Sequence, residues 1–166
     1  VPPEWFGIQL HELYYPKDVR VEFTGGGLEH LSPIRGFQFF ETFTVLDADV
    51  IGVVGEHPVV ARRALGKGSI LYIGTFVGHS YDFDTEPELR GLIRHIAAEA
   101  GVVPTVEAGS GCFVRTAPSG NGTIIIVTNP RDRDAAPWLT FPTLRGSLKD
   151  LLTGEDLGPV TKQRHT

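Results

Sequence analysis

The chain has 166 residues, of which 41% are hydrophobic and 21% charged, with a net charge of −5 at pH 7. A chain of this length buries about 68–70% of its unfolded surface, so it can form one domain or two small modules with a real core. The negative charge and the scattered Lys and Arg residues argue against a nucleic-acid partner, and no apolar run approaches the roughly 20 residues of a membrane-spanning helix.

The first segments of the chain predict strands. Residues 1–13 mix prolines with aromatics and indicate a connector that packs through Trp5. Residues 19–23 alternate with period two and end in three glycines, which is typical of a half-buried strand and a turn. Residues 37–45 also alternate, and Glu41 interrupts their apolar face, which predicts a bulge or an edge position there.

Three short apolar runs follow, at residues 48–54, 57–63 and 69–74. The glycine-rich turn 65–68 joins the last two into a predicted β-hairpin. It is not a phosphate loop, because it leads into a strand and not into a helix N-terminus. The apolar density of residues 70–73 predicts a strand buried on both faces.

The strongest helix signal covers about residues 85–100. Thr85 and Glu88 fit a capping box at its start, and Gly101 and Pro104 end it. Its apolar residues recur at helical spacing, so we expect the helix to lie on a sheet. The apolar stripe consists of Leu89, Leu92, Ile93, Ile96, Ala97 and Ala100.

After this helix the pattern changes to short strands separated by turns. Strands are predicted at residues 112–116, 123–128, 136–141 and 146–152. We therefore expect a partial α/β module over residues 1–104 and a small, truncated antiparallel β-module over residues 105–166. The predicted fold class is α+β and β-rich, with one main helix.

One loop carries candidate binding residues. His79, Asp82 and Asp84 follow a predicted buried strand, where α/β folds commonly place ligand loops. A histidine with two carboxylates is suited to binding a metal or to acid–base work. The same residues also fit a polar loop in which Asp84 or Thr85 caps the helix, and we favour that interpretation.

Aromatic residues form a second candidate surface, for stacking a sugar or for contacting a protein. Its members are Trp5, Tyr14, Tyr15, Phe39, Phe40 and Trp138. A buried or interface role is the favoured interpretation, because aromatics are enriched at such contacts. Cys112 is interpreted as a small apolar strand residue, because no helix follows it that would lower its thiol pKa. We expect no catalytic residue, no metal and no cofactor.

Seven segments occur together in a recognisable order. They read ADVIG (48–52), HPVVARR (57–63), GKGSILYIGT (66–75), AGVVP (100–104), FVRT (113–116), GTIIIVTNP (122–130) and LKDLLTG (148–154). By this order and spacing, residues 45–157 resemble the C-terminal half of family 42 β-galactosidases.

The resemblance implies a flavodoxin-type, glutamine-amidotransferase-like trimerisation module followed by a small β-domain. In that family, glutamates of a preceding (β/α)₈ barrel carry out catalysis, and no part of this chain matches that barrel. The first βα units of the module are missing as well, and Cys112 does not lie at the place of an amidotransferase nucleophile. The implied role is a non-catalytic accessory or oligomerisation fragment of a bacterial glycoside hydrolase. Its implied partners are further copies of itself, as a trimer in the parent enzyme, and the absent barrel of the same polypeptide.

A second resemblance gives an alternative. Residues 66–80 are similar to the end of trehalose-utilisation-type proteins, which share the amidotransferase-like fold. This similarity implies a stand-alone small-molecule enzyme or sugar-binding protein that uses the loop 79–84. It does not account for the β-module that follows Gly109.

The two ends of the chain give a further expectation. The chain starts at Val1, contains no methionine and ends in a polar stretch, so we expect a removed start or a piece of a larger protein. No signal peptide is visible, and we expect a cytoplasmic location.

Overall fold

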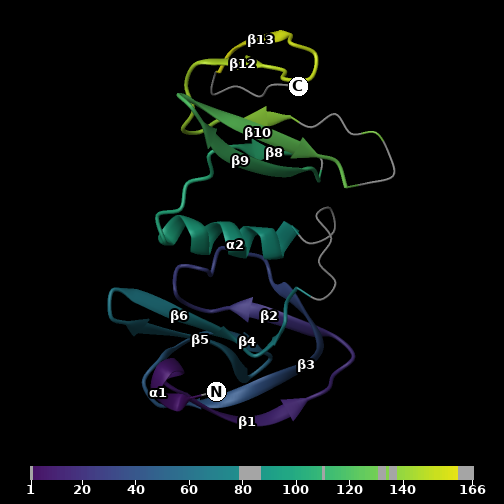
Figure 1. Ribbon diagram of the computed structural model, residues 1–166. Coiled ribbons are helices and arrows are strands. Elements are labelled where there is room, and N and C mark those ends of the chain that lie inside the picture. Colours follow the sequence, from purple (N-terminus) through teal and green to yellow (C-terminus); the bar gives the residue numbers. More distant parts are fainter. Residues whose placement is uncertain (1, 79–86, 110, 131–133, 135–137, 161–166) are drawn as a thin grey trace. The chain divides into compact units, whose positions relative to one another are not determined.

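The computed structural model describes residues 2–78, 87–109, 111–130, 134 and 138–160 (Figure 1). The chain divides into two compact units, Val1–Ile96 and Ala97–Thr166. Strands dominate both units, and every described strand pair is antiparallel. The β-rich α+β class is therefore confirmed, whereas the division after residue 104 stays a prediction.

The first unit is built on one antiparallel sheet. It starts with the short helix α1 (Pro3–Phe6). Its strands are β1 (Ile8–Tyr14), β2 (Val19–Phe23), β3 (Ile34–Val45), β4 (Asp49–Val54), β5 (His57–Leu65), β6 (Gly68–Ile73) and β7 (Thr75–Phe76). The sheet order is β1-β3-β2-β4-β5-β6, and β7 pairs with β3. A flavodoxin-like arrangement, whose strands would be parallel, is not confirmed.

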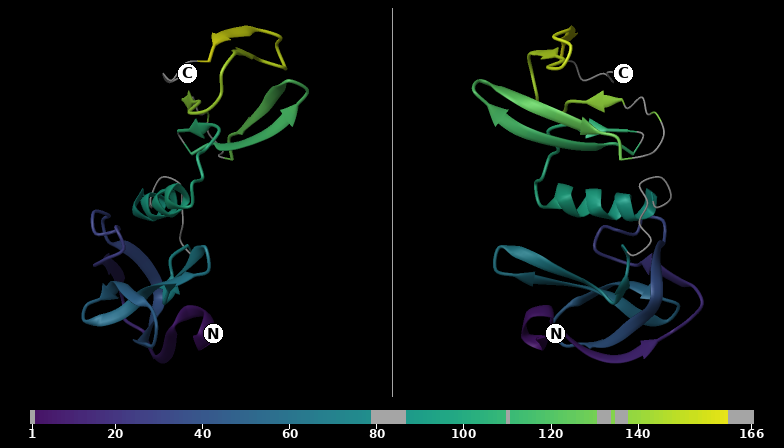
Figure 2. Two further views of the ribbon diagram at one scale, coloured as in Figure 1. Left: turned by 90° about the vertical axis from the view of Figure 1, so that its left-hand side faces the viewer. Right: turned by 45° about the vertical axis from the view of Figure 1, so that its right-hand side comes forward.

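Strand β3 closes this sheet on itself. Its first residues pair with β2, and its middle pairs with β7. Gly74 lies between β6 and β7, and its N–H donates to the Val59 carbonyl of β5 at 2.8 Å. The Gly74 carbonyl accepts the N–H of Glu41, in β3, at 2.6 Å. Strands β3, β2, β4, β5 and β6–β7 thus form a continuous hydrogen-bonded ring, and Figure 2 shows its curved strands from two further sides.

The main core is formed by one face of this ring. Every second residue of β2 is buried, which confirms the half-buried strand predicted from the alternation at residues 19–23. Helix α2 (Pro87–Glu99) packs Leu89 and Leu92 against the same cluster. The apolar stripe predicted for this helix includes residues that do not face the core, because Ile93 is 54% and Ile96 36% exposed. The side of the helix that carries the two leucines is therefore the one that contacts the core.

A second, smaller cluster lies on the other face of the sheet. It contains the buried Ile8, Phe43 and Ala61, with Phe6 and Tyr72 packed against them. In β6, Tyr72 faces this cluster while Leu71 and Ile73 pack on the main core. Strand β6 therefore contacts apolar residues on both faces, as predicted, although its side chains are half-buried.

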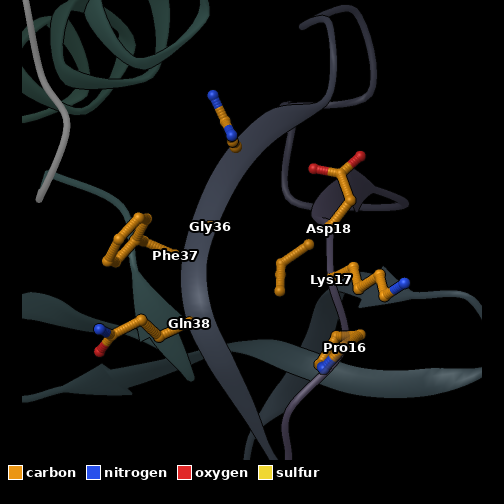
Figure 3. A pocket seen from close by; sticks show the side chains of 8 residues that line it. Pro16, Lys17, Asp18, Gly36, Phe37 and Gln38 are labelled. Atoms are coloured by element: carbon orange, nitrogen blue, oxygen red, sulfur yellow. The ribbon is translucent and has the colours of Figure 1, made fainter.

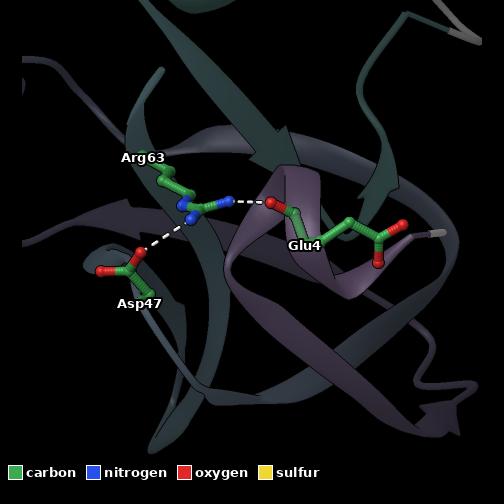
Figure 4. A network of polar contacts seen from close by, with 3 residues as sticks. All are labelled: Glu4, Asp47 and Arg63. Atoms are coloured by element: carbon green, nitrogen blue, oxygen red, sulfur yellow. Dashed lines mark hydrogen bonds and ion pairs between the residues drawn. The ribbon is translucent and has the colours of Figure 1, made fainter. Parts of the chain in front are cut away.

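The N-terminal residues are held by Arg63 of β5 (Figure 4). Its guanidinium donates to the Glu4 carbonyl of α1 and forms an ion pair with Asp47 at 2.7 Å. The Gly7 carbonyl accepts two further N–H groups, from Leu46 and Asp47. The segment predicted as a connector over residues 1–13 therefore forms, in its described part from Pro2 on, a short helix and most of an outer strand.

The described residues of the second unit form three separate two-stranded sheets. They pair β8 (Glu107–Ala108) with β11 (Leu139–Thr140), β9 (Phe113–Ser119) with β10 (Gly122–Thr128), and β12 (Ser147–Lys149) with β13 (Asp156–Pro159). Cys112 and Phe141 are its buried apolar side chains among the described residues, so its core is thin. Neither helix that the structure describes has the length and apolarity of a membrane-spanning segment.

Replacing Gly74 with alanine is expected to lower the free energy of unfolding by about 1–3 kcal/mol. A Cβ at this position would collide with the Glu41 carbonyl oxygen at the point where the ring closes. Urea unfolding of the whole chain, followed by circular dichroism, measures the change.

Gly68→Ala is the matched control. No atom lies within 4 Å of a Cβ placed on Gly68, at the start of β6. Its free energy of unfolding should change by no more than about 0.5 kcal/mol. Equal losses in both variants would mean that the ring does not depend on the close approach at Gly74.

Candidate functional site

A shallow pocket of about 240 Å³ lies beside the start of β2 and the first half of β3. Its lining includes Lys17, Asp18, Phe37 and Gln38 (Figure 3). In that view, Lys17 and Asp18 lie on one side of β3, while Phe37 and Gln38 lie on the other. The volume is below the roughly 300–1,000 Å³ that is typical of small-molecule sites. The pocket is therefore better suited to a surface contact than to enclosing a substrate.

Gln38 has an unusual backbone conformation, with a φ of 66°. The register between β3 and β7 shifts between Phe37 and Phe40, so Gln38 and Phe39 form a bulge. The Thr75 hydroxyl donates to the Phe39 carbonyl at 2.5 Å and holds the bulge in place. A second irregularity lies at Glu41, where a bulge or an edge position was predicted: the register between β1 and β3 shifts between the pairs Leu10–Phe43 and Leu13–Glu41.

The bulge brings three aromatic rings together, which we call the aromatic patch: Tyr15, Phe39 and Phe76. The ring centroids of Phe39 and Phe76 lie 4.8 Å apart in an edge-to-face arrangement, and those of Tyr15 and Phe39 lie 6.3 Å apart. Tyr15 is 72% and Phe76 51% exposed, and Phe39 is half-buried. The patch is thus a cluster of large apolar side chains on the surface of the first unit.

The other aromatic candidates do not join this patch. Tyr14 and Phe40 stack with centroids 5.0 Å apart, and Phe40 is buried. The Tyr14 hydroxyl donates to Glu12 at 2.6 Å, and this bond raises the pKa of Tyr14 above its ordinary value. Trp5 lies on α1 and is 58% exposed. Sequence analysis therefore found Tyr15 and Phe39 but missed Phe76, which lies in a strand too short to show a period.

Trp138 lies in the second unit and packs against Gly109. The Gly109 N–H donates to the Trp138 carbonyl at 3.0 Å, and a Cβ on Gly109 would collide with the indole ring. The indole is half-buried, and one of its sides is covered by this contact. The geometry gives Trp138 a packing role, and a sugar-stacking role for it stays a prediction.

The loop candidates His79, Asp82 and Asp84 lie outside the described residues, and their binding role stays a prediction. Within the described part of the chain, no group of three or more His, Cys, Asp or Glu side chains is arranged to hold a metal ion. Cys112 is buried and not in a disulfide.

Two further polar contacts shift pKa values for structural reasons. Burial and a 2.6 Å hydrogen bond to Glu41 raise the pKa of Tyr72 well above its ordinary value. In the turn after β12, the backbone N–H groups of Leu152 and Thr153 lower the pKa of Asp150. The first contact joins β6 to β3, and the second fixes a turn. Both therefore support the fold, and neither indicates acid–base chemistry.

Comparison with known proteins finds similarity to β-galactosidases, although no family model matches the chain. A β-galactosidase from Arthrobacter sp is 28% identical over 127 residues, which are 76% of this chain and 15% of that protein. The structure of β-galactosidase from Bacillus circulans sp. alkalophilus has a TM-score of 0.70 and 22% identity, over 95% of this chain and 23% of that chain. A family 42 β-galactosidase from G. stearothermophilus has a TM-score of 0.66 and 19% identity, over 95% of this chain and 22% of that chain.

These matches confirm the resemblance to a segment of family 42 β-galactosidases. The chain spans only 15% to 23% of the length of these relatives. It therefore corresponds to a part of such enzymes, and the likeness to the solved structures is a likeness of fold.

Replacing Gln38 with glycine is expected to raise the free energy of unfolding by up to about 1 kcal/mol. Glycine adopts a positive φ without the roughly 1–2 kcal/mol cost that a Cβ brings there. Gln38→Val should lower the free energy of unfolding, because a β-branched residue tolerates this conformation poorly. Thermal unfolding of both variants tests this, and equal stability would mean that the bulge does not keep its positive φ in solution.

Proposed function

We propose that this chain is a non-catalytic accessory and self-association module of a β-galactosidase-like glycoside hydrolase. The observation that supports it is that nearly all of this chain matches only a small part of a β-galactosidase: 95% of this chain aligns with 23% of that chain. Most glycoside hydrolases act with two carboxyl groups that flank the scissile bond at a fixed separation of about 5–9.5 Å. In the family that the sequence resembles, those groups belong to a barrel that this chain does not match.

In this proposal, the aromatic patch is the surface through which the module associates. Tyrosine and phenylalanine are enriched in the cores of protein interfaces, which a polar rim surrounds. Lys17 and Asp18, both exposed at the neighbouring pocket, supply polar groups of that kind. The partners are other copies of the module, forming a trimer in the parent enzyme, and the catalytic barrel of the same polypeptide.

The amidotransferase-like part of the proposal concerns the parent enzyme. The described strands of the first unit pair only in antiparallel fashion. Parallel strands of a flavodoxin-like trimerisation module would therefore come from chain beyond these 166 residues. The first unit would then be the antiparallel end of that module.

Activity measurements test the non-catalytic role. The 166-residue chain is expected not to hydrolyse a nitrophenyl β-galactoside, and His79→Ala should leave its stability and mass in solution unchanged. The alternative, an enzyme or sugar-binding protein that uses the loop 79–84, predicts turnover or sugar binding that His79→Ala removes. Either signal, measured by absorbance or by titration calorimetry, would contradict the accessory role.

Substitutions in the patch test the association surface. Phe76→Ser and Tyr15→Ser should each weaken self-association by about tenfold or more, because exposed aromatic anchors commonly contribute over 1 kcal/mol to a contact. Sedimentation velocity over a concentration series measures the change. Trp5→Ser is the control, since Trp5 is a similarly exposed aromatic outside the patch. If Trp5→Ser has the largest effect, the patch is not the contact surface.

A further inference from the structure

Strands β2 and β3 carry two arginines directly opposite each other. Arg20 of β2 pairs with Arg35 of β3 in the register of the two strands, and both side chains are exposed. The side chains of such a pair lie on the same face of the sheet, with Cβ atoms about 4.5–5.5 Å apart. Their neighbours along the strands, Val19, Val21 and Ile34, are buried in the main core. Both arginines therefore point away from that core.

This arrangement of like charges is only partly compensated within the chain. Like charges directly opposite each other lower the stability of a sheet. Arg20 has a partner, because its Nε donates to the Asp18 carboxylate at 3.2 Å. Arg35 forms no ion pair or side-chain hydrogen bond within the part of the chain that the structure describes. A negative group from outside this part of the chain is therefore needed to compensate its charge.

The pocket beside the start of β2 lies next to this arginine pair (Figure 3). Arg35 and Lys17 both line it, and Lys17 likewise has no ion-pair partner among the described residues. Asp18 is the one acidic side chain in the pocket lining, and Arg20 binds it. Glu22, on the same face of β2, is about 13 Å further along the strand from Asp18 and does not line the pocket.

The charge at the pocket matches that of a phosphate group. Lys17, Arg20 and Arg35 outweigh the single carboxylate of Asp18 and leave two positive charges uncompensated, in a chain whose net charge is −5. A phosphate group carries about −1.5 to −2 charges near pH 7 and has three strong acceptor oxygens. Arginine binds such oxygens through two parallel hydrogen bonds. A carboxylate, with one negative charge, would leave part of the positive charge uncompensated.

We propose that this pocket binds a phosphate group, either free or carried by a small molecule. Arg35 and Lys17 contact the phosphate oxygens, and Arg20 holds Asp18 away from them. The pocket volume of about 240 Å³ is too small to enclose a whole small molecule, so the phosphate enters and the rest of a larger ligand stays outside. The proposal does not rest on the accessory role proposed above, because it concerns a ligand and not the association of the module.

Titration of the full chain with inorganic phosphate tests the site. The backbone amides of the ¹⁵N-labelled protein are followed by NMR at pH 7 in a buffer of low ionic strength. Saturable shifts are expected at residues 17–20 and 35–38, and none in the second unit. Arg35→Gln should weaken binding by about tenfold or more, because it removes charge-assisted hydrogen bonds. Arg94→Gln is the matched control, since it removes an exposed arginine of the first unit from α2, away from the pocket.

Thermal unfolding separates a ligand-binding arginine from a structural one. In phosphate-free buffer, Arg35→Gln should unfold at a higher temperature than the unchanged chain, because it removes one of two like charges. With saturating phosphate, the unchanged chain should unfold at a higher temperature than before, because the ligand binds only the folded state. The variant should gain little. Sodium chloride at equal ionic strength is the control for screening of the repulsion. An arginine with a purely structural role would lower the unfolding temperature in both buffers when replaced.

A second titration, with a hexose 6-phosphate, distinguishes the two sources of the phosphate group. Tighter binding of the sugar phosphate indicates a carried phosphate, and equal affinity indicates the free ion. Three outcomes would overturn the proposal. The first is an equal effect of Arg35→Gln and Arg94→Gln on binding. The second is a set of shifts that spread over the whole chain without saturating, as for an adventitious ion only. The third is binding of acetate as tight as that of phosphate.

Discussion

The first unit depends on the bend in strand β3. This strand pairs with β2 at its start, with β7 in its middle and with β1 over its second half. A regular strand has only two edges, so it meets three partners only if its pairing changes along its length. The bulge at Gln38 and Phe39 makes that change, and it also places the Phe39 ring against Phe76. Closure of the sheet and formation of the aromatic patch therefore have one cause.

The elements that the sequence predicted well are those in which buried side chains recur at a regular spacing along the chain. Strand β2 was predicted residue for residue, because every second side chain in it is buried. Strand β1 was missed because its alternation is broken at Glu12, where its register with β3 shifts. Its pairing partner β3 also lies far away in the sequence. Tertiary pairing of this kind overrides local propensity in strands. The same reason explains β7, whose two residues are too few to show any period.

The sequence could predict which kinds of residue form the candidate site, but not how these residues are arranged. Tyr15 and Phe39 were recognisable as aromatic candidates, but their contact depends on the shifted registers of β1 and β7 against β3. Those shifts involve Gln38, a residue with no sequence signal for a positive φ, since glycine or asparagine usually occupies such positions. Trp138 was recognisable for the same reason as Tyr15, and its contact with Gly109 appears only once β8 and β11 are paired.

The two units differ in how completely they bury their own apolar residues. The first unit has two core clusters, one on each face of its sheet. The second unit buries Cys112 and Phe141 among its described residues, while Leu151 is 71% and Leu152 98% exposed. Small domains with little buried surface gain stability by contacting something else, whether another domain or another copy. The exposed apolar surface of the second unit is thus better explained by such a contact than by an enclosed binding site.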